Sequence, residues 1–322
     1  MAEILMLDRS EVERLLDADA LLEALEGAFV AIADGEVSAP PRIAAESPDG
    51  LVGAMPGWMP GTLAVKLVSV FPGNDARELP SHQGVVLLFD EETGEPRALM
   101  DAERITALRT AGAAAVAARA LSRPDAGVLA VLGAGVQGRS HLETFPRVRT
   151  LREVRIASRT TAHAEALAEE AAAEGWCGEA EIRLVLSFED AVRGADLVCC
   201  CTDAREPVLE AGWLGAGTHV SSVGGTHGRE LDEETVRENP VYVEWRGAAE
   251  HPVPAGAGEL QEIDPGAVVE LGEVLAGRHP GRGSPEEITV YKSTGHAAED
   301  AAAARLVLER AREAGAGRTV RI

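Results

Sequence analysis

The amino-acid sequence predicts an α/β protein built around a doubly wound parallel sheet, together with a second α+β domain. After residue 122, short apolar runs alternate with helical stretches, and a glycine-rich turn directly follows the first of those runs. Before residue 122 the pattern changes repeatedly between helix and strand. A chain of 322 residues is long enough for two domains of ordinary size. We therefore expect one domain over residues 1–121 and 297–322 and the other over residues 122–296.

The first domain mixes both kinds of element. Residues 10–34 have helical spacing, with Ser10 as the expected N-cap. Further along come strands at 50–56, 62–71 and 84–90, a hairpin-like turn at 90–94, and a helix over 101–121. The last helix, expected over 297–313, is rich in alanine and amphipathic, so it should pack back on this domain.

The second domain alternates strands and helices along its length. Strands joined by helical connections run parallel, so this alternation is typical of a Rossmann-type, doubly wound sheet. The expected strands are 128–132, 154–157, 182–186, 197–201, 219–223 and 241–244, with the clearest helices over 161–174 and 187–193.

Charge, hydropathy and cysteine usage exclude several classes of partner. The net charge of −23 argues against nucleic acid and anionic membranes, and no apolar run reaches the length of a membrane helix. Three of the four cysteines, Cys199, Cys200 and Cys201, are consecutive at the end of an expected strand. Because neighbouring strand residues point to opposite faces, they cannot converge on one metal. We expect free thiols, no metal and a cytoplasmic location.

A dinucleotide site is expected at the first strand of the second domain. The segment Gly133-Ala-Gly135-Val-Gln-Gly138 follows that strand and opens a helix, which is the context that such a motif requires. Gly133 permits a tight turn, Gly135 lets the backbone approach a pyrophosphate, and Gly138 lets the helix pack on the strand. The helix N-terminus offers free N–H groups to the phosphates. The alternative is a purely structural glycine turn.

The next strand ends in Ser158, Arg159 and Thr160, and these residues bear on the choice of cofactor. A site for NAD(H) usually has an acidic residue here, which binds the ribose 2′-hydroxyl. In this chain an arginine and two hydroxyl groups suit a 2′-phosphate instead. NADPH is therefore favoured over NADH, unless Arg159 is only a solvated loop charge.

Arginine replaces lysine almost everywhere, since only Lys66 and Lys292 occur among 30 basic residues. Lys66 lies in an apolar strand, where burial of an unpaired ammonium is costly, so a function is favoured over chance. Arg42, in an extended segment, and Arg109, on an Ala-rich helix, are the other candidates for a substrate site. Two arginines would hold a carboxylate, and a nearby lysine would bind the same group or donate a proton. His82 either contacts the cofactor or carries a proton, or is an ordinary surface histidine.

Segments spread over nearly the whole chain support a family resemblance. They are residues 65–69, 80–83, 85–90, 109–110, 132–137, 158–160, 222–225, 271–273 and 291–295. Together they resemble the ornithine cyclodeaminase/mu-crystallin family, and the Ser-His-Gln, Ser-Arg-Thr and Lys-Ser segments are more similar to its mu-crystallin branch. The resemblance implies reduction of cyclic ketimines, dehydrogenation of alanine or N-alkyl amino acids, or conversion of ornithine to proline and ammonia.

The resemblance also implies a homodimer with a pocket between the two domains, the first of which binds substrate and dimerises. Arg42, Lys66 and Arg109 would face the carboxylate of a small imino or amino acid. The cofactor would be lined by Ser81, His82, Ala134, Val136, Gln137, Arg159, Thr160, Thr202 and Lys292.

One position departs from the cyclodeaminase pattern. In cyclodeaminases an aspartate follows the Val-Gly-Gly turn and serves as acid and base on the substrate amine, whereas this chain has Thr226 there. A threonine hydroxyl is no useful base near pH 7, but hydride delivery to a preformed C=N bond needs only a positioned cofactor and one proton donor. We therefore expect an NADPH-dependent reductase of small cyclic 2-imino carboxylates, of the pyrroline- or piperideine-2-carboxylate type, in which Thr226 shapes the pocket or binds water. Ornithine cyclodeamination, alanine or N-alkyl amino-acid dehydrogenation, and nucleotide binding without turnover stay open as alternatives.

Overall fold

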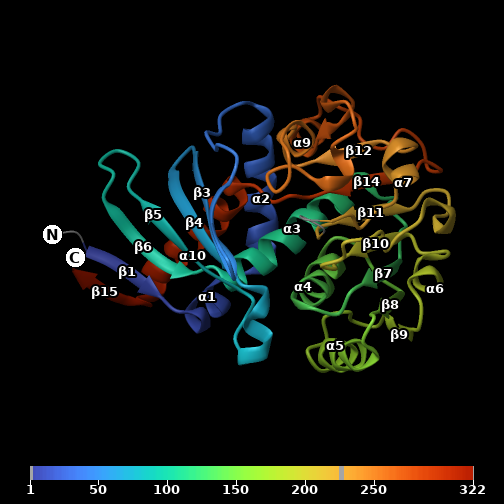
Figure 1. The fold of residues 1–322 in the computed structure, drawn as a ribbon, viewed down its shortest axis with the longest axis horizontal. Helices are drawn as coiled ribbons and strands as arrows, with labels where there is room; N and C mark the ends of the chain where they lie inside the picture. Colours follow the sequence, from blue (N-terminus) through green and yellow to red (C-terminus); the bar gives the residue numbers. More distant parts are fainter. Residues whose placement is uncertain (1–2, 225–227, 322) are drawn as a thin grey trace. The chain divides into compact units, whose positions relative to one another are not determined.

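The computed structural model describes residues 3–224 and 228–321. Two separate sheets, each with its own helices, make up the described part of the chain (Figure 1). One sheet is largely antiparallel, and the other is wholly parallel. The α/β class with a doubly wound parallel sheet, which the sequence predicts, is therefore confirmed.

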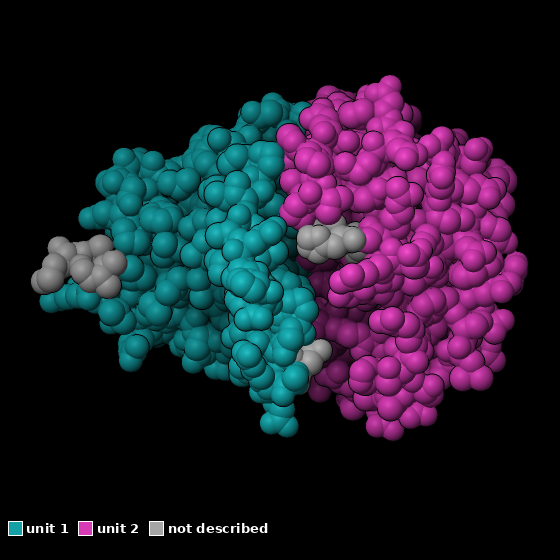
Figure 2. All heavy atoms as spheres, viewed as in Figure 1, with its two compact units in different colours: residues 1–109, 296–322 teal, residues 110–295 magenta. Residues whose placement is uncertain are grey.

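The chain divides into two compact units (Figure 2). Unit 1 contains residues 1–109 and 296–322, and unit 2 contains residues 110–295. The division falls inside α3 (Glu103–Leu121), at Arg109, whereas the sequence suggests the end of that helix. The C-terminal helix groups with the N-terminal residues.

Unit 1 is built on a sheet whose seven described strands lie in the order β15-β1-β6-β5-β4-β3-β2. Neighbours are antiparallel except β1 and β6, and β1 and β15 bring opposite ends of the chain together at one edge (Figure 1). The strands are β1 (Glu3–Leu7), β2 (Ile43–Ser47), β3 (Gly50–Met59), β4 (Thr62–Val70), β5 (His82–Phe89), β6 (Pro96–Asp101) and β15 (Arg318–Arg321). The other helices of this unit are α1 (Arg9–Leu15), α2 (Ala18–Ala33), α10 (Ala297–Ala314) and a 3-10 helix at Pro72–Arg77.

Helix α10 packs on β3, β4 and α2 and covers one face of this sheet. Alanines line its buried side, so it approaches the strands closely: a Cβ added at Gly57 of β3 would lie 2.7 Å from the Cβ of Ala297. The ring of His296 caps the helix by accepting a backbone hydrogen bond, and Gly315 ends it in the left-handed conformation, with a φ of 60°. Side chains that point from β4 toward α10 are therefore buried, and Lys66 is one of them.

The expected helix over 10–34 is two helices in the structure, so that prediction is corrected. Asp8 caps α1 and Asp17 caps α2, each by accepting a hydrogen bond from the first turn. The predicted cap Ser10 lies inside α1, where its hydroxyl donates to the Asp8 carboxylate. Aspartate accepts hydrogen bonds from the free N–H groups at a helix start as well as serine does. The apolar spacing continues on both sides of the break, so it does not show where the first helix ends.

Unit 2 is built on a sheet whose eight described strands are all parallel, in the order β13-β12-β14-β11-β10-β7-β8-β9. The strands are β7 (Val128–Leu132), β8 (Glu153–Ala157), β9 (Glu181–Val185), β10 (Leu197–Cys200), β11 (His219–Ser222), β12 (Val241–Val243), β13 (Val269–Glu270) and β14 (Thr289–Lys292). The helices are α4 (Val136–Thr144), α5 (Thr161–Ala173), α6 (Phe188–Val192), α7 (Glu233–Arg237), α8 (Gly247–Glu250) and α9 (Leu271–Leu275). Every strand expected in this domain is present, and β13 and β14 are additional.

The strand order of unit 2 reverses at β7. From β7 the chain moves outward through α4, β8 and α5 to β9, and it returns through α6 to β10 on the other side of β7. Because crossovers between parallel strands are right-handed as a rule, this reversal is expected to put the helices of the two directions on opposite faces of the sheet. In open α/β sheets, ligands bind at the carboxyl ends of the strands where the order reverses. The glycine motif at the end of β7 lies at this position.

Within the described residues, no helix is both long and apolar enough to cross a membrane. The same part of the chain holds no group of three or more side chains arranged to bind a metal ion. All four cysteines are free and buried. Burial raises the pKa of Cys199, Cys200 and Cys201 well above the ordinary thiol value, so these thiols stay protonated as core groups.

Candidate active site

A buried group of charged side chains lies between the sheet and α10 of unit 1. Lys66 points from β4 toward this helix and is 3% exposed, because alternation along the strand sends Leu67 to the other face. Its Nζ donates a hydrogen bond to Asp300 Oδ1 at 2.9 Å and lies 2.9 Å from Oδ2. The ammonium is therefore paired, and its partner comes from a distant part of the chain.

Arg109 joins the same group from α3. Its Nε donates to Asp300 Oδ1 at 3.0 Å, and its Nη1 donates to Glu299 Oε2 at 3.0 Å. Both acids lie in the first turn of α10, where the positive end of the helix dipole favours carboxylates. The carboxylate of Asp300 thus bridges the lysine and the arginine.

Arg42 supplies a third positive charge. It is half-buried just before β2, and its charge acts on Lys66, on Asp300 and on the neighbouring ring of His296. We call Arg42, Lys66, Arg109, Glu299 and Asp300 the charged cluster. Three cations and two carboxylates are thus gathered in one part of unit 1. The fold brings together the three residues that the sequence assigns to a substrate carboxylate.

Burial and neighbouring charges act on the titration of this cluster. Burial lowers the pKa of Lys66 to about 8, with Asp300 opposing the shift and Arg109 and Arg42 adding to it. Burial by itself would raise the pKa of Asp300, but the three cations hold it below its ordinary value. Burial also lowers the pKa of His296 to about 4, so this ring is neutral near pH 7. At neutral pH the Lys66 ammonium is therefore mostly protonated and Asp300 is ionised.

Sequence reasoning misses Glu299, Asp300 and His296. The signal that would find them is the interruption of an alanine-rich buried face by two adjacent carboxylates, in His296-Ala-Ala-Glu-Asp-Ala-Ala-Ala-Ala. Buried carboxylates need cations opposite them, and the chain's rare strand lysine, Lys66, is an obvious partner.

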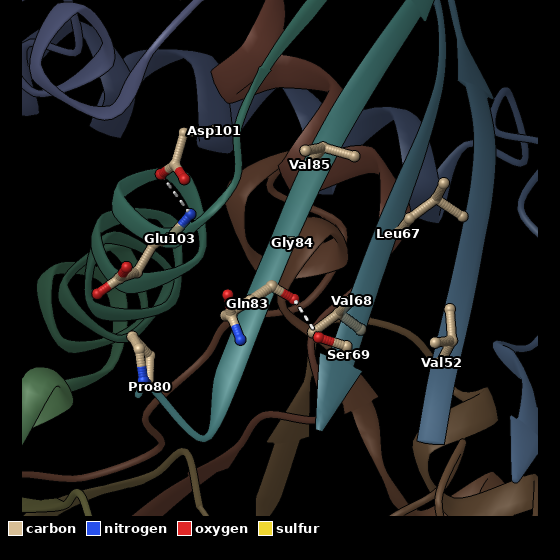
Figure 3. Close-up of a pocket in the computed structure, with 10 residues that line it drawn as sticks. All are labelled: Val52, Leu67, Val68, Ser69, Pro80, Gln83, Gly84, Val85, Asp101 and Glu103. Carbon is tan, nitrogen blue, oxygen red and sulfur yellow. Dashed lines mark hydrogen bonds between the residues drawn. The ribbon is translucent and has the colours of Figure 1, made fainter. Parts of the chain in front are cut away.

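A separate pocket of about 420 Å³ lies on the other face of the same sheet (Figure 3). Figure 3 shows Val52, Leu67 and Val85 on neighbouring strands, with Asp101 near the start of α3. Its lining residues are Val52, Leu67, Val68, Ser69, Pro80, Gln83, Gly84, Val85, Asp101 and Glu103. Because Leu67 and Lys66 point to opposite faces of β4, this pocket is not part of the charged cluster.

The glycine motif of unit 2 has the geometry of a phosphate-binding turn. Gly133 follows β7 with a φ of 111°, and a Cβ there would lie 2.6 Å from the carbonyl oxygen of Cys201. A Cβ at Gly138 would overlap the carbonyl oxygen of Gly133, so glycine is needed for α4 to pack this closely. Around Gly135, the N-cap of α4, the described residues leave the space within 4 Å of a Cβ position empty. The start of α4 is therefore open on this side, and these residues fit a pyrophosphate.

The other residues expected at the cofactor surround this turn or follow the next strand. Ala134 and Gln137 are half-buried at the start of α4, and Val136 is exposed. Ser158, Arg159 and Thr160 directly follow β8, which pairs in register with β7, so they lie at the same edge of the sheet. The side chains of Arg159 and Thr160 are exposed, and Ser158 Oγ accepts a hydrogen bond from the Thr160 N–H at 3.3 Å.

One buried carboxylate ties together the carboxyl ends of β10 and β11. Glu230 Oε1 accepts hydrogen bonds from the N–H and the hydroxyl of Thr202, both at 2.7 Å. Its Oε2 accepts from Ser222 Oγ and from the Gly224 N–H, both at 2.8 Å. Four hydrogen bonds satisfy both carboxylate oxygens. They fix Thr202, an expected cofactor residue, next to Gly133.

Lys292, at the end of β14, is 1% exposed and completes this network. Its Nζ donates to Ser222 Oγ at 2.9 Å, to the Gly224 carbonyl at 2.7 Å and to Glu259 Oε1 at 3.1 Å. These bonds use all three protons of an ammonium, so Lys292 holds the loop after β11, and its expected contact with the cofactor stays a prediction. Sequence reasoning misses Glu230 and Glu259, because loop glutamates are normally solvated and nothing in their spacing marks burial.

Three further residues belong to neither group. Ser81 and His82 lie in unit 1 at the start of β5, where Ser81 Oγ and His82 Nδ1 are 3.1 Å apart. Their expected contact with the cofactor stays a prediction. Thr226 lies outside the described residues, so its expected role stays a prediction as well.

The fold and the site define a class of protein. A Rossmann-type sheet with a phosphate-binding turn, and a cationic cluster suited to a small carboxylate, are the parts of a nicotinamide-dependent enzyme. Residues 2–315 match the ornithine cyclodeaminase/mu-crystallin family, and the chain belongs to this family. Its members are NAD(P)-dependent oxidoreductases or cyclodeaminases, so the expectation of an enzyme is confirmed.

Three relatives span nearly the whole chain. The ketimine reductase mu-crystallin of Mus musculus is 37% identical over 306 residues, which cover 92% of this chain and 94% of the relative. The solved structure of Thermococcus litoralis Delta(1)-pyrroline-2-carboxylate reductase with NADH and L-proline has a TM-score of 0.91 and 36% identity, and covers 98% of this chain and 100% of that one. An archaeal alanine dehydrogenase dimer with bound NAD has a TM-score of 0.92, 33% identity and 99% coverage of both chains.

Proposed function

We propose that this enzyme is an NADPH-dependent reductase of small cyclic 2-imino carboxylates, such as pyrroline-2-carboxylate or piperideine-2-carboxylate. The observation that supports this most is the grouping of Arg42, Lys66 and Arg109 in the charged cluster, in which Lys66 and Arg109 share Asp300. Cations grouped in this way suit a substrate carboxylate, which they would bind through charge-assisted hydrogen bonds. The names of two relatives, a ketimine reductase and a pyrroline-2-carboxylate reductase, support the same substrate class.

The cations of the cluster have different tasks in this reaction. Arg42 and Arg109 hold the substrate carboxylate through charge-assisted hydrogen bonds. Lys66 orients the same group and donates a proton to the imine nitrogen, directly or through a water molecule. A pKa of about 8 suits this task, because the ammonium is present at neutral pH and still releases its proton readily. When bound, the nicotinamide supplies a hydride to the adjacent carbon.

NADPH is proposed because of the residues that follow β8. Arg159 and Thr160 are exposed there next to the half-buried Ser158, and this set suits a ribose 2′-phosphate. Gly133, Gly135 and the start of α4 would hold the pyrophosphate. NADH is the alternative, since two structural relatives hold NADH or NAD.

We further propose a homodimer formed through the face of the unit 1 sheet that lies opposite α10. Ile43, Ala54, Leu67 and Val85 lie in register across four strands on the face away from α10, and Ile43 and Leu67 are 68% and 39% exposed. Such an apolar row normally marks an interface, and the alanine dehydrogenase relative is a dimer. Light scattering should give twice the chain mass. A cytoplasmic location is proposed from the four free, buried cysteines.

Two other reactions are the alternatives. Dehydrogenation of alanine or N-alkyl amino acids is favoured by the alanine dehydrogenase relative, and it would use the same carboxylate site and cofactor. Ornithine cyclodeamination needs an acid and base on the substrate amine, and Thr226 stands where cyclodeaminases have an aspartate.

The absorbance of the reduced cofactor separates these candidates. The enzyme is given NADPH or NADH with pyrroline-2-carboxylate, with piperideine-2-carboxylate, or with pyruvate plus ammonia or methylamine. We expect the highest kcat/KM with a cyclic imine and NADPH. Faster reduction with pyruvate and an amine would favour the dehydrogenase. Ornithine turnover that releases ammonia without net change in reduced cofactor would show a cyclodeaminase instead.

A further inference from the structure

We propose that Asp300 is the positioning residue of the substrate site: its carboxylate sets Lys66 and Arg109 side by side and balances the ammonium of Lys66. The inference deepens the proposed function and rests on it only for the claim that the two cations bind substrate. Asp300 acts through these neighbours rather than on the substrate itself.

Three elements of unit 1 converge on this carboxylate. Lys66 comes from β4, Arg109 from α3 and Asp300 from α10, and Asp300 Oδ1 accepts a hydrogen bond from both cations, at 2.9 and 3.0 Å. Asp300 is 1% exposed, so water does not readily take its place. A carboxylate shared by two cations from different elements fixes the distance between them, which a rigid site for a second carboxylate requires.

The neighbouring acid has a different task, although it lies in the same helical turn. Glu299 Oε1 accepts a hydrogen bond from the backbone N–H of His296 at 2.8 Å and so completes the cap of α10. Its Oε2 accepts from Arg109 at 3.0 Å. Glu299 therefore anchors the helix start and one side of Arg109, whereas Asp300 is the carboxylate paired with Lys66.

The charges around Lys66 explain why this pairing matters. Arg109 faces it from α3, Arg42 faces it from the segment before β2, and the ring of His296 at the cap of α10 is neutral near pH 7. Without Asp300, the ammonium would be buried among like charges. Burial and like charges both favour loss of its proton, so at neutral pH a large share of Lys66 would no longer be able to donate one.

The small number of lysines permits a direct test on the full-length enzyme. After labelling with 13C-lysine, only Lys66 and Lys292 give side-chain signals in NMR spectra, and Lys66→Met assigns them. In the wild type we expect the Lys66 signal to titrate with a midpoint of about 8. In Asp300→Asn the Lys66 midpoint should fall by about 1 pH unit or more, while the chemical shift of the Lys292 signal should not change. An unchanged Lys66 midpoint in the folded variant overturns the proposal.

Two further variants separate charge from position. Glu299→Gln is the matched control, because Glu299 is adjacent and equally buried, and its Lys66 midpoint should stay near the wild-type value. Asp300→Glu keeps the charge but moves it by one methylene group, so the midpoint should stay near 8 while kcat falls about tenfold. This variant decides the question if Asp300→Asn does not fold. A lowered midpoint or an undiminished kcat in Asp300→Glu contradicts the proposal.

Imine reduction provides a second measurement. In Asp300→Asn we expect kcat to fall more than KM rises at pH 8, and the pH optimum to move lower, where more of Lys66 is protonated. Equal pH profiles for wild type and variant would count against the proposal. A wild-type enzyme that reduces no imine would refute the proposed function, whereas the Lys66 titration would still decide the role of Asp300.

Discussion

The two lysines of this chain, one in each unit, are both buried but have opposite surroundings. Lys66 and Lys292 are 3% and 1% exposed. Lys66 shares the carboxylate of Asp300 with Arg109, so the charges around it are mainly positive. Lys292 is bonded to Glu259 and to two uncharged oxygens, so every one of its protons already has an acceptor within the protein.

This difference separates a structural lysine from one that is available to a ligand. An ammonium whose protons are all bonded within the protein, as in Lys292, holds a loop and gains little from a further anion. Lys66 instead has a single carboxylate as its partner, which it shares with an arginine. Burial is the same in both, so the neighbours decide the role.

The largest expected effect comes from Lys66→Ala. The loss of the proton donor should lower kcat/KM for imine reduction by about 10²- to 10⁴-fold, while NADPH affinity, measured by fluorescence titration, stays the same. Lys66→Arg keeps the positive charge but offers no releasable proton. Compared with Lys66→Ala, it should therefore improve substrate binding more than it improves kcat. If Lys66→Ala turned over imines at the wild-type rate, Lys66 would have no part in the reaction.

Lys292→Met should reduce stability instead. It leaves Glu259 buried without its cation, and removal of one partner of a buried pair costs about 3–5 kcal/mol of unfolding free energy. Lys66→Met should cost less, because Asp300 keeps Arg109 as a partner. Urea unfolding compares the two variants, and adding Glu259→Gln to Lys292→Met should recover part of the loss. Equal unfolding free energies for the two lysine variants would mean that Lys292 contributes no more to stability than Lys66 does.

The parallel sheet is predictable from the sequence because its strands are continuous apolar runs. All five residues of β7 are buried, and such a continuous apolar run can be recognised without knowing which strands lie beside it. The break between α1 and α2 is not predictable from apolar spacing, which continues across it. It depends on Asp8 and Asp17 as caps, and aspartates are common enough elsewhere that these two do not stand out.

The sequence indicates the basic residues of the charged cluster but not its carboxylates. Lys66 stands out because lysine is rare in this chain and the strand around it is apolar. Asp300 lies 234 residues further along, and no local spacing connects the two positions. Their contact depends on how α10 packs on β4, and close packing of small residues such as Gly57 and Ala297 determines that.

Buried histidines extend the comparison of the two units to acid stability. Burial lowers the pKa of His219 to about 3 and of His141 to about 4, both in unit 2, and that of His296 in unit 1 to about 4. The unfolded chain takes up these protons near pH 6.5 while the folded chain does not, so stability is full above pH 6.5 and falls as the pH drops toward 4. At pH 5 each ring should cost about 2 kcal/mol, more of it in unit 2.

Thermal unfolding at pH 7 and pH 5 measures this effect. Tm should fall by at least several degrees, and His219→Gln should make the fall smaller. A Tm that does not change between these pH values would mean that the three rings are not held neutral.

Arg159 gives the smallest expected effect and tests a charge that is exposed rather than buried. Arg159→Ser should raise KM for NADPH about tenfold, because a charge-assisted hydrogen bond contributes about 1.5–3 kcal/mol, and should change KM for NADH little. Arg193→Ala is the control, since that arginine is also exposed and pairs with Glu189 of α6. Equal changes for the two cofactors would mean that Arg159 does not bind the 2′-phosphate. A larger change for NADPH than for NADH would mean that Arg159 binds the cofactor. Arg159 would then resemble Lys66, to which we assign a ligand, and not Lys292, whose protons are all bonded within the protein.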